Sequence, residues 1–229
     1  MITLIYGMPG YGKTLWMHDF IRAHPDHLFI VNDHAAEWGP DAAHWRGSPP
    51  STVQVFEPND EMPQPEDLPD SGIIVIRGKE HGQISNLVME KGNATYVDDE
   101  LDFAARREGW NDSPLRYIVH QGRHLPNKAG EYTQCNIIGA CRRPQSLHTD
   151  ITDIVDEVYI FRIQGNRTLQ RLLADSMIED SEWDIIRVMP KFHFRHWPSG
   201  QYLTVKPIGD NREGKQRGQQ RPGEPKRNR

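Results

Sequence analysis

The segment Gly7–Thr14, with the sequence GMPGYGKT, constrains the fold of this chain more than any other stretch. It fits the pattern G-x-x-x-x-G-K-[ST], in which backbone N–H groups and one lysine hold nucleotide phosphates. The residues ITLIY before it are apolar and β-prone, and the residues KTLWMHDFIRAH that overlap its end predict a helix. A strand, a glycine-rich loop and a helix in this order predict a phosphate-binding P-loop within an α/β fold.

The residue types of this loop suit phosphate binding. Its glycines let the backbone turn tightly and approach phosphate oxygens. Lys13 is expected to reach the β- and γ-phosphates, and the Thr14 hydroxyl to ligate Mg²⁺. We therefore expect ATP and Mg²⁺ as cofactors. The predicted nucleotide-binding residues are Gly7, Met8, Pro9, Gly10, Tyr11, Gly12, Lys13, Thr14 and Leu15.

Strand-like and helix-like segments alternate along the chain. After the first strand, strands are predicted at 27–33, 52–58, 72–78, 93–100, 135–142 and 157–163, and helices at 13–24, 81–91, 101–109, 113–124, 145–154 and 166–180. Several of the strands are continuous apolar runs, which is typical of a parallel sheet covered on both faces. The alternation predicts a three-layer α/β fold, with a mainly parallel sheet and helices on both faces. Together with the P-loop, this arrangement resembles P-loop NTPases of the RecA/ASCE type. The segment 185–206, which contains the turn PSG, predicts a C-terminal antiparallel hairpin.

Acidic residues end one of the apolar strands, in the segment ATYVDDEL. A P-loop protein needs a carboxylate for Mg²⁺ and, if it hydrolyses ATP, a group that activates water. We assign Asp99 to the metal and Glu100 to the water, as the acidic pair of a Walker B strand. Asp98 could replace Asp99, because the alternation of side chains is uncertain at the end of a strand.

Arginine side chains are candidates for neutralising the charge that develops on the γ-phosphate. The candidates are Arg106, Arg107, Arg123, Arg142 and Arg143. Arg123 comes at a predicted helix end, just before a loop. Arg142 and Arg143 follow a strand, at the edge of a parallel sheet where ligands bind.

Charge is distributed unevenly along the chain. The net charge is −5, yet the segment from Lys206 onward holds eight basic and three acidic residues. This composition predicts a disordered tail at 206–229 after an ATPase domain at 1–205. A basic tail could contact nucleic acid, although a solvated terminus explains it equally well.

Nothing in the sequence predicts export or a membrane span. No apolar run approaches the roughly 18 residues of a membrane helix, and no basic segment precedes an apolar one at the N-terminus. The two cysteines lie in one apolar run and predict no disulfide framework, so we expect a cytoplasmic protein.

Four segments together resemble the HerA/FtsK superfamily of P-loop ATPases, which are multimeric motors that move DNA or other polymers through a ring. The segments are GMPGYGKT, YVDDE, QGRH and IIGACRRPQSLHTDITDIVDEVYIFRI, and the resemblance runs from about residue 1 to 165. Two branches are most similar. One is the genome-packaging ATPase of tailless, membrane-containing phages, and the other is the Zot-like assembly ATPase of filamentous phages.

The resemblance assigns roles to single residues. Lys13 and Thr14 match the P-loop pair, Asp99 and Glu100 match the Walker B pair, and Arg123 matches the arginine-finger position. The family usually carries a glutamine that senses the γ-phosphate immediately before the R-P dipeptide. Here Arg142 occupies that place, so sensing by Arg142, or weaker sensing, is implied. The segment PNKAGEYTQ is a further departure, inserted between GRHL and the next strand.

The function implied by the resemblance is an ATP-driven motor that packages phage DNA into a preformed capsid. It implies double-stranded DNA, a hexameric ring of identical subunits, and a capsid vertex or other virion proteins as partners, in the host cytoplasm or on the virion. Zot-like proteins usually add a membrane helix after the ATPase domain, and none is predicted here. A small-molecule P-loop kinase and a nucleotide-dependent switch are alternatives from other classes. Glu100 argues against the switch, which needs no efficient water-activating carboxylate.

Overall fold

The computed structural model describes residues 1–43, 45, 52–106, 109–122 and 124–206. Within them, nine strands form one sheet in the order β11-β10-β9-β1-β8-β5-β2-β4-β3. All neighbours from β9 to β3 are parallel, whereas β10 and β11 run antiparallel at one edge. The strands are β1 (Ile2–Tyr6), β2 (Leu28–Asn32), β3 (Val53–Phe56), β4 (Gly72–Ile76), β5 (Ala94–Asp98), β8 (Asn136–Cys141), β9 (Glu157–Ile160), β10 (His193–Trp197) and β11 (Gln201–Thr204).

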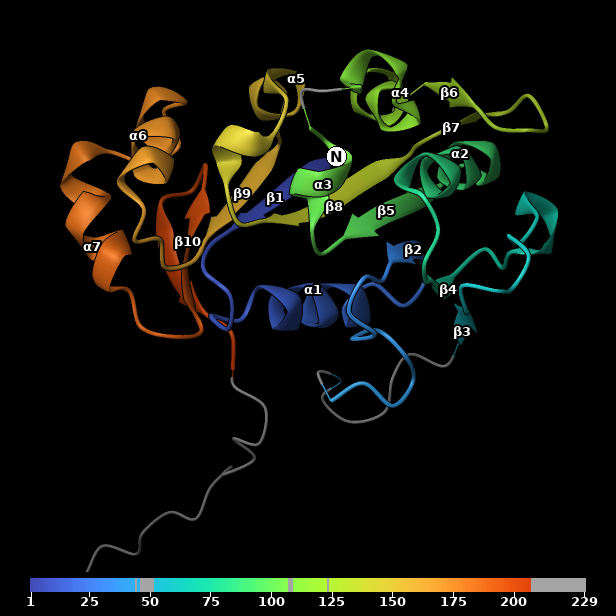
Figure 1. The fold of residues 1–229 in the computed structure, drawn as a ribbon, viewed down its shortest axis with the longest axis horizontal. Helices are drawn as coiled ribbons and strands as arrows, with labels where there is room; N and C mark the ends of the chain where they lie inside the picture. The colour runs from blue at the N-terminus through green and yellow to red at the C-terminus, as the bar shows by residue number, and fades with distance from the viewer. Residues whose placement is uncertain (44, 46–51, 107–108, 123, 207–229) are drawn as a thin grey trace, which may run out of the picture.

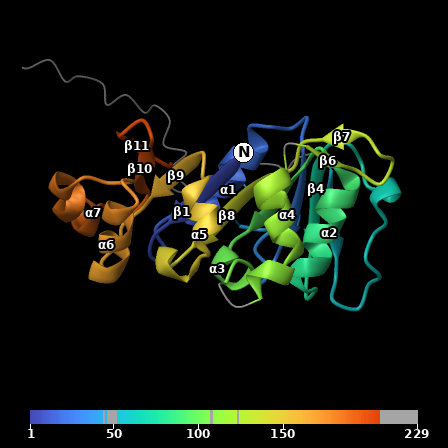
Figure 2. The same ribbon diagram turned by 90° about the horizontal axis from the view of Figure 1, so that it is seen from above.

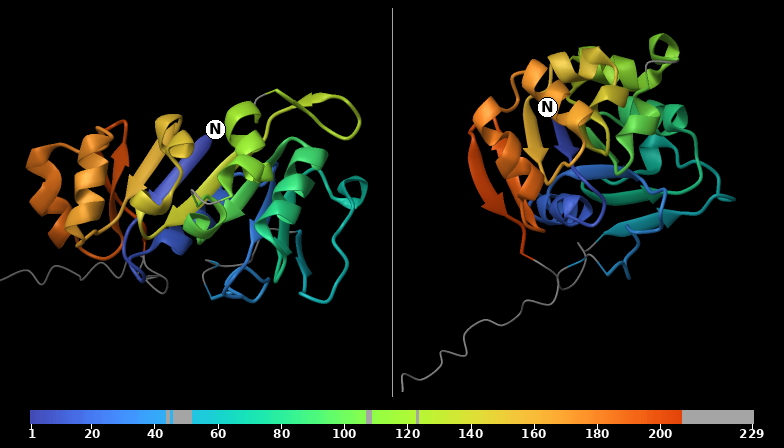
Figure 3. Two further views of the ribbon diagram at one scale, coloured as in Figure 1. Left: turned by 45° about the horizontal axis from the view of Figure 1, so that its top comes forward. Right: turned by 60° about the vertical axis from the view of Figure 1, so that its left-hand side comes forward.

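Helices cover both faces of this sheet (Figure 1). Helix α1 lies on one face, and α2, α3, α4 and α5 lie on the other, where Figure 2 shows α5, α4 and α2 spread across the strands. In Figures 1 and 3, α6 and α7 stand beside β10 at one end of the sheet. The helices are α1 (Lys13–Arg22), α2 (His81–Lys91), α3 (Leu101–Ala104), α4 (Pro114–Gln121), α5 (Thr149–Asp153), α6 (Asn166–Ala174) and α7 (Trp183–Val188).

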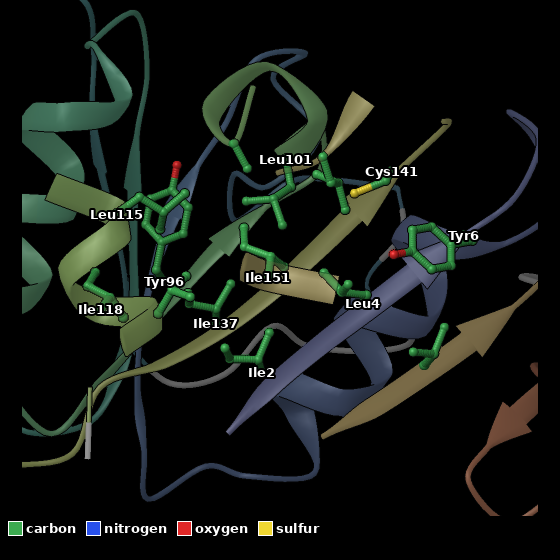
Figure 4. Close-up of a cluster of buried hydrophobic side chains, with 14 of the residues drawn as sticks. Ile2, Leu4, Tyr6, Tyr96, Leu101, Leu115, Ile118, Ile137, Cys141 and Ile151 are labelled. Atoms are coloured by element: carbon green, nitrogen blue, oxygen red, sulfur yellow. The ribbon is translucent and has the colours of Figure 1, made fainter. Parts of the chain in front are cut away.

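Side-chain alternation along the strands gives each face its own core. On β1, Leu4 and Tyr6 pack in the cluster under α2–α5, whereas Ile5 packs in the cluster under α1. Figure 4 shows the first cluster, in which Ile137 and Tyr96 from neighbouring strands meet side chains of the covering helices. Each fully buried aliphatic side chain of this kind contributes about 1.5–3 kcal/mol relative to exposure. The predicted three-layer, mainly parallel α/β fold with a C-terminal antiparallel hairpin is confirmed.

Several element bounds differ from the prediction. The predicted helix at 101–109 is the short α3, and the predicted helix at 166–180 ends at Ala174. The first hairpin strand begins only at His193, because 183–188 form α7, which buries Ile186 against the sheet. The insert PNKAGEYTQ contains part of a small antiparallel pair, β6 (Leu125–Pro126) with β7 (Tyr132–Thr133).

Gly139 allows Leu101, which follows the acidic end of β5, to pack closely against β8. It lies on β8 opposite Asp98, and a Cβ added there would lie 2.2 Å from Leu101 Cδ2 and 2.8 Å from Leu101 Cβ. Gly139→Ala should therefore displace α3 and lower the free energy of unfolding by about 1–3 kcal/mol in a urea titration. Gly165→Ala is the matched control, because a Cβ there would meet its nearest atom at 3.5 Å. Equal stability of the two variants would contradict this account of the packing.

Candidate nucleotide-binding site

The loop between β1 and α1 has a backbone that only glycine adopts easily. Gly7 has φ of 148° and Gly12 has φ of 108°, both in the region that side chains disfavour. There is also no room for a side chain at either position. A Cβ on Gly7 would lie 2.6 Å from Phe161 Cβ, and one on Gly12 would lie 2.9 Å from Phe192 Cδ1. The loop is tied to the strands beyond it, because Met8 N–H donates to Arg162 O (3.0 Å) and Phe192 N–H donates to Tyr11 O (3.1 Å). These constraints hold the loop in one shape.

Lys13 is the first residue of α1, and its ammonium group lies over the loop. Nζ donates to Gly7 O at 2.9 Å and to Met8 O at 3.2 Å. Burial lowers the pKa of Lys13, while the nearby Asp99 carboxylate acts in the opposite direction. A buried ammonium beside a helix N-terminus and open backbone N–H groups can attract phosphate oxygens strongly.

Thr14 and Asp99 come together beside Lys13, although 85 positions separate them in the chain. Thr14 Oγ1 donates to Asp99 Oδ2 at 3.1 Å and lies 3.3 Å from Oδ1. Burial, followed by the charge of Glu37, raises the pKa of Asp99 to about 6. A divalent cation would offset this cost of charging a desolvated carboxylate. A hydroxyl and a carboxylate at one point are hard oxygen donors, so this pair fits Mg²⁺.

Asp98 points to a different set of partners. Its carboxylate is fully buried and accepts hydrogen bonds from the Tyr96 hydroxyl (2.7 Å), the Asn32 amide (3.1 Å) and the backbone N–H of Glu100 (2.8 Å). Burial acts to raise the pKa of Asp98, but hydrogen bonds from the surrounding side chains hold it well below its usual value. Of the two aspartates, Asp99 is therefore the one that contacts Thr14.

Glu100 and Arg142 form an ion pair at the edge of the same site. Glu100 is the residue before α3, and Arg142 follows β8. Arg142 Nη2 donates to Glu100 Oε1 at 2.6 Å, with 56% of the Arg142 side chain and 28% of the Glu100 side chain exposed. The arginine thus lies beside the acidic residues of its own subunit.

One cavity of about 710 Å³ lies at the carboxyl ends of β1, β2 and β5. That volume lies within the range of about 300–1,000 Å³ for small-molecule and cofactor sites. The lining residues are Pro9, Gly10, Gly12, Lys13, Thr14, Leu15, Asp33, His34, Ala35, Glu37, Asp99, Glu100, Arg142 and Phe192. Gly7 and Met8 line a neighbouring cavity with Arg142 and Arg143, and the Tyr11 hydroxyl accepts from Arg162 at 2.9 Å.

Some lining residues were missed by sequence reasoning. Asp33, His34 and Glu37 follow β2, whose carboxyl end lies at the same edge of the sheet as that of β1. They could have been predicted as site residues, because ligands bind at the carboxyl ends of parallel strands. Phe192 precedes β10 and could not have been predicted in this way.

The remaining arginine candidates lie elsewhere. Arg123 and Arg107 fall outside the described residues. Arg106 and Arg143 line a third cavity with Phe103, over whose ring the Arg106 guanidinium lies at 4.5 Å from the centroid. Of the arginine candidates within the described residues, Arg142 is the one that lines the P-loop cavity.

The described helices include none with the length and apolar character that crossing a membrane requires.

The fold of this chain is similar to that of solved structures. No protein-family model matches the sequence, and no curated protein matches it. Among solved structures, the genome packaging NTPase B204 from Sulfolobus turreted icosahedral virus 2, in complex with ATP-gammaS, matches with a TM-score of 0.62 at 17% identity, over 90% of this chain and 97% of that one. B204, the DNA-packaging ATPase from Sulfolobus turreted icosahedral virus, matches with the same TM-score at 15% identity and the same coverage. The chain therefore has the P-loop NTPase fold of these proteins.

Proposed function

We propose that the chain is an ATPase that binds ATP and Mg²⁺ at the P-loop cavity and hydrolyses ATP to ADP and phosphate. The observation that carries this proposal is the meeting of the Thr14 hydroxyl and the Asp99 carboxylate at 3.1 Å, beside the buried Lys13 ammonium. A phosphate cradle, a pair of hard oxygen donors and a second carboxylate within one cavity are the parts that phosphoryl transfer to water requires.

Each residue has a separate task in this proposal. The loop N–H groups and Lys13 bind the phosphates, while Thr14 and Asp99 hold Mg²⁺, which supplies positive charge to the β- and γ-phosphates when bound. Glu100 orients the attacking water and accepts its proton. Arg142, which reaches Glu100 at 2.6 Å, is placed to sense the γ-phosphate in the position where the resembling family has glutamine.

The wider function that we propose is DNA translocation for genome packaging. Two observations support it: the motifs resemble those of HerA/FtsK motors, and the fold matches B204, a DNA-packaging ATPase, over 90% of this chain. On this proposal the partners are double-stranded DNA, identical subunits in a hexameric ring, and a capsid vertex or other virion proteins, in the host cytoplasm or on the virion. The match to a packaging protein favours packaging over Zot-like extrusion. The basic tail, of which only Lys206 is described, stays a prediction, as does the division of the chain at residue 206.

Hydrolysis with and without DNA tests this function. The full chain should release phosphate from ATP with water as the sole acceptor. Linear double-stranded DNA should raise the steady-state rate several-fold at low salt, and added salt should reduce the effect because binding to phosphates releases counterions. Asp99→Asn is the control that should abolish both rates. Hydrolysis that is insensitive to DNA would contradict the translocation proposal, and transfer to a metabolite without hydrolysis would identify a kinase.

A further inference from the structure

A second group of ligand-type side chains lies next to the P-loop cavity. His34 follows β2, His81 is the first residue of α2, and Asp98 is the last residue of β5. His34 Nε2 lies 3.3 Å from Asp98 Oδ1, and His81 Nδ1 lies 3.3 Å from Asp98 Oδ2. One ligand atom from each of the three residues lies within 4.8 Å of the other two. Three separate elements of the fold thus converge on one point.

The charge of Asp98 needs a positive partner. Its side chain is 0% exposed, and the Tyr96 hydroxyl, the Asn32 amide and the Glu100 N–H that donate to it are all neutral. In the described part of the chain, no lysine or arginine forms an ion pair with it, and two further acidic residues follow it directly. Buried charges are normally paired or coordinate a metal. The imidazolium form of His34 or His81, or a metal ion held between them, would supply that positive charge.

The geometry suits a metal. Zinc bonds of about 2.0–2.2 Å in a tetrahedral arrangement place neighbouring ligand atoms about 3.3–3.5 Å apart. Here each imidazole nitrogen lies 3.3 Å from a different oxygen of Asp98, His34 Nε2 from Oδ1 and His81 Nδ1 from Oδ2, so an ion between the two rings would be held by both oxygens or by one after a small turn of the carboxylate. The Tyr96 hydroxyl, 2.7 Å from Oδ2, would orient the carboxylate, as outer hydrogen bonds do in metal sites. The Asn32 amide nitrogen lies 2.8 Å from His81 Nδ1 and 3.1 Å from Asp98 Oδ2, so a bound ion would replace its contact with His81 and leave the one with Asp98. His34 also lines the P-loop cavity, so further coordination positions could be reached from that side. Imidazole ligands select zinc and similar ions, whereas Mg²⁺ prefers oxygen.

We propose that His34, His81 and Asp98 bind one divalent transition metal ion, for which zinc is the appropriate probe. This site is distinct from the Thr14–Asp99 pair and does not depend on the ATPase proposal. The two sites would be linked through the backbone, because Asp98 Oδ1 accepts the N–H of Glu100 at 2.8 Å. A metal held by Asp98 would fix the turn that carries Asp99 and Glu100.

Calorimetric titration of the untagged full-length chain with Zn²⁺, in excess Mg²⁺, tests the proposal. We expect one zinc per chain, and an affinity at least about tenfold lower for His34→Ala and for His81→Ala, since loss of an outer-shell partner alone lowers affinity by about 10–100-fold. His193→Ala is the matched control, because His193 is exposed on β10, outside the cluster, and should leave the titration unchanged. Cobalt(II) provides a second readout, with visible absorption bands typical of tetrahedral coordination in the wild type that both cluster variants lose.

Two outcomes would overturn the proposal. One is the absence of a one-to-one zinc complex in the wild-type chain, which would leave a protonated histidine as the partner of Asp98. The other is an equal zinc affinity of the wild type, His34→Ala and His81→Ala. Circular dichroism verifies the fold of each variant. If His81→Ala does not fold, His34→Ala decides the question, because the His34 side chain is partly exposed at the cavity edge.

Discussion

Glu100→Gln is expected to bind ATP about as tightly as the wild type and to hydrolyse it at least about 100-fold more slowly. The amide keeps the size of the side chain and one oxygen for Arg142, but it cannot take a proton from water. Lys13→Ala should instead lose ATP binding, and hydrolysis with it, because the phosphates lose the ammonium that lies 2.9 Å from Gly7 O. Nucleotide affinity by fluorescence titration and steady-state phosphate release separate the two effects.

Glu37 offers a matched control for this pair of variants. It lines the same cavity, and Glu37→Gln makes the same chemical change at a carboxylate that we assign no proton transfer. Its turnover should stay within a few-fold of the wild type. If Glu100→Gln hydrolyses ATP at the wild-type rate, Glu100 does not activate the water. The other carboxylates of the cavity would then be tested.

Arg123→Ala should retain ATP binding and lose about 1,000-fold or more of its turnover, as expected for an arginine finger. The structure adds a reason to look beyond Arg142 for a residue that acts between subunits, since Arg142 contacts Glu100 of its own chain at 2.6 Å. Arg123 lies outside the described residues, but α4 ends at Gln121, two positions before it. The motif QGRH and this position after a helix remain the basis of the prediction.

Mixing two inactive variants tests whether Arg123 acts in the neighbouring subunit. Lys13→Ala lacks a working ATP site and retains Arg123, whereas Arg123→Ala retains the site and lacks the arginine. Mixed assemblies contain some complete interfaces, so hydrolysis should rise above that of either variant and depend on the mixing ratio. Light scattering must show that the subunits assemble and exchange. A rate that stays at the level of the single variants at every ratio would rule out Arg123 as the residue supplied in trans. The other candidates, Arg106, Arg107, Arg142 and Arg143, would then be tested.

The fold could be predicted because its signals are local. The glycine pattern after an apolar strand, and the alternation of apolar runs with helical segments, depend on neighbouring residues in the chain. The choice between Asp98 and Asp99 could not be made in this way, since it depends on which side of the sheet each carboxylate points to after β5 ends. In the structure Asp99 reaches Thr14, whereas Asp98 turns to Tyr96 and Asn32.

The missed parts of the site depend on contacts between distant segments. Phe192 lies at the P-loop because the hairpin strand β10 pairs with β9, which pairs with β1. No periodicity near position 192 carries that information. The Arg142–Glu100 contact similarly joins the ends of β8 and β5, which are neighbours in the sheet and about forty residues apart in the chain.

The position of β1 has a consequence for how the protein is made. This strand begins at Ile2, whereas its hydrogen-bonding partners, β8 and β9, begin only at Asn136 and Glu157. Its apolar residues therefore stay unpaired until about 130 further residues have been synthesised, since β1 ends at Tyr6 and β8 begins at Asn136. Pairing at such sequence separation is slow and exposes hydrophobic surface to aggregation. The loop after β1 can reach its final contacts only once Arg162 and Phe192 have been made, because Met8 N–H donates to Arg162 O and Phe192 N–H donates to Tyr11 O.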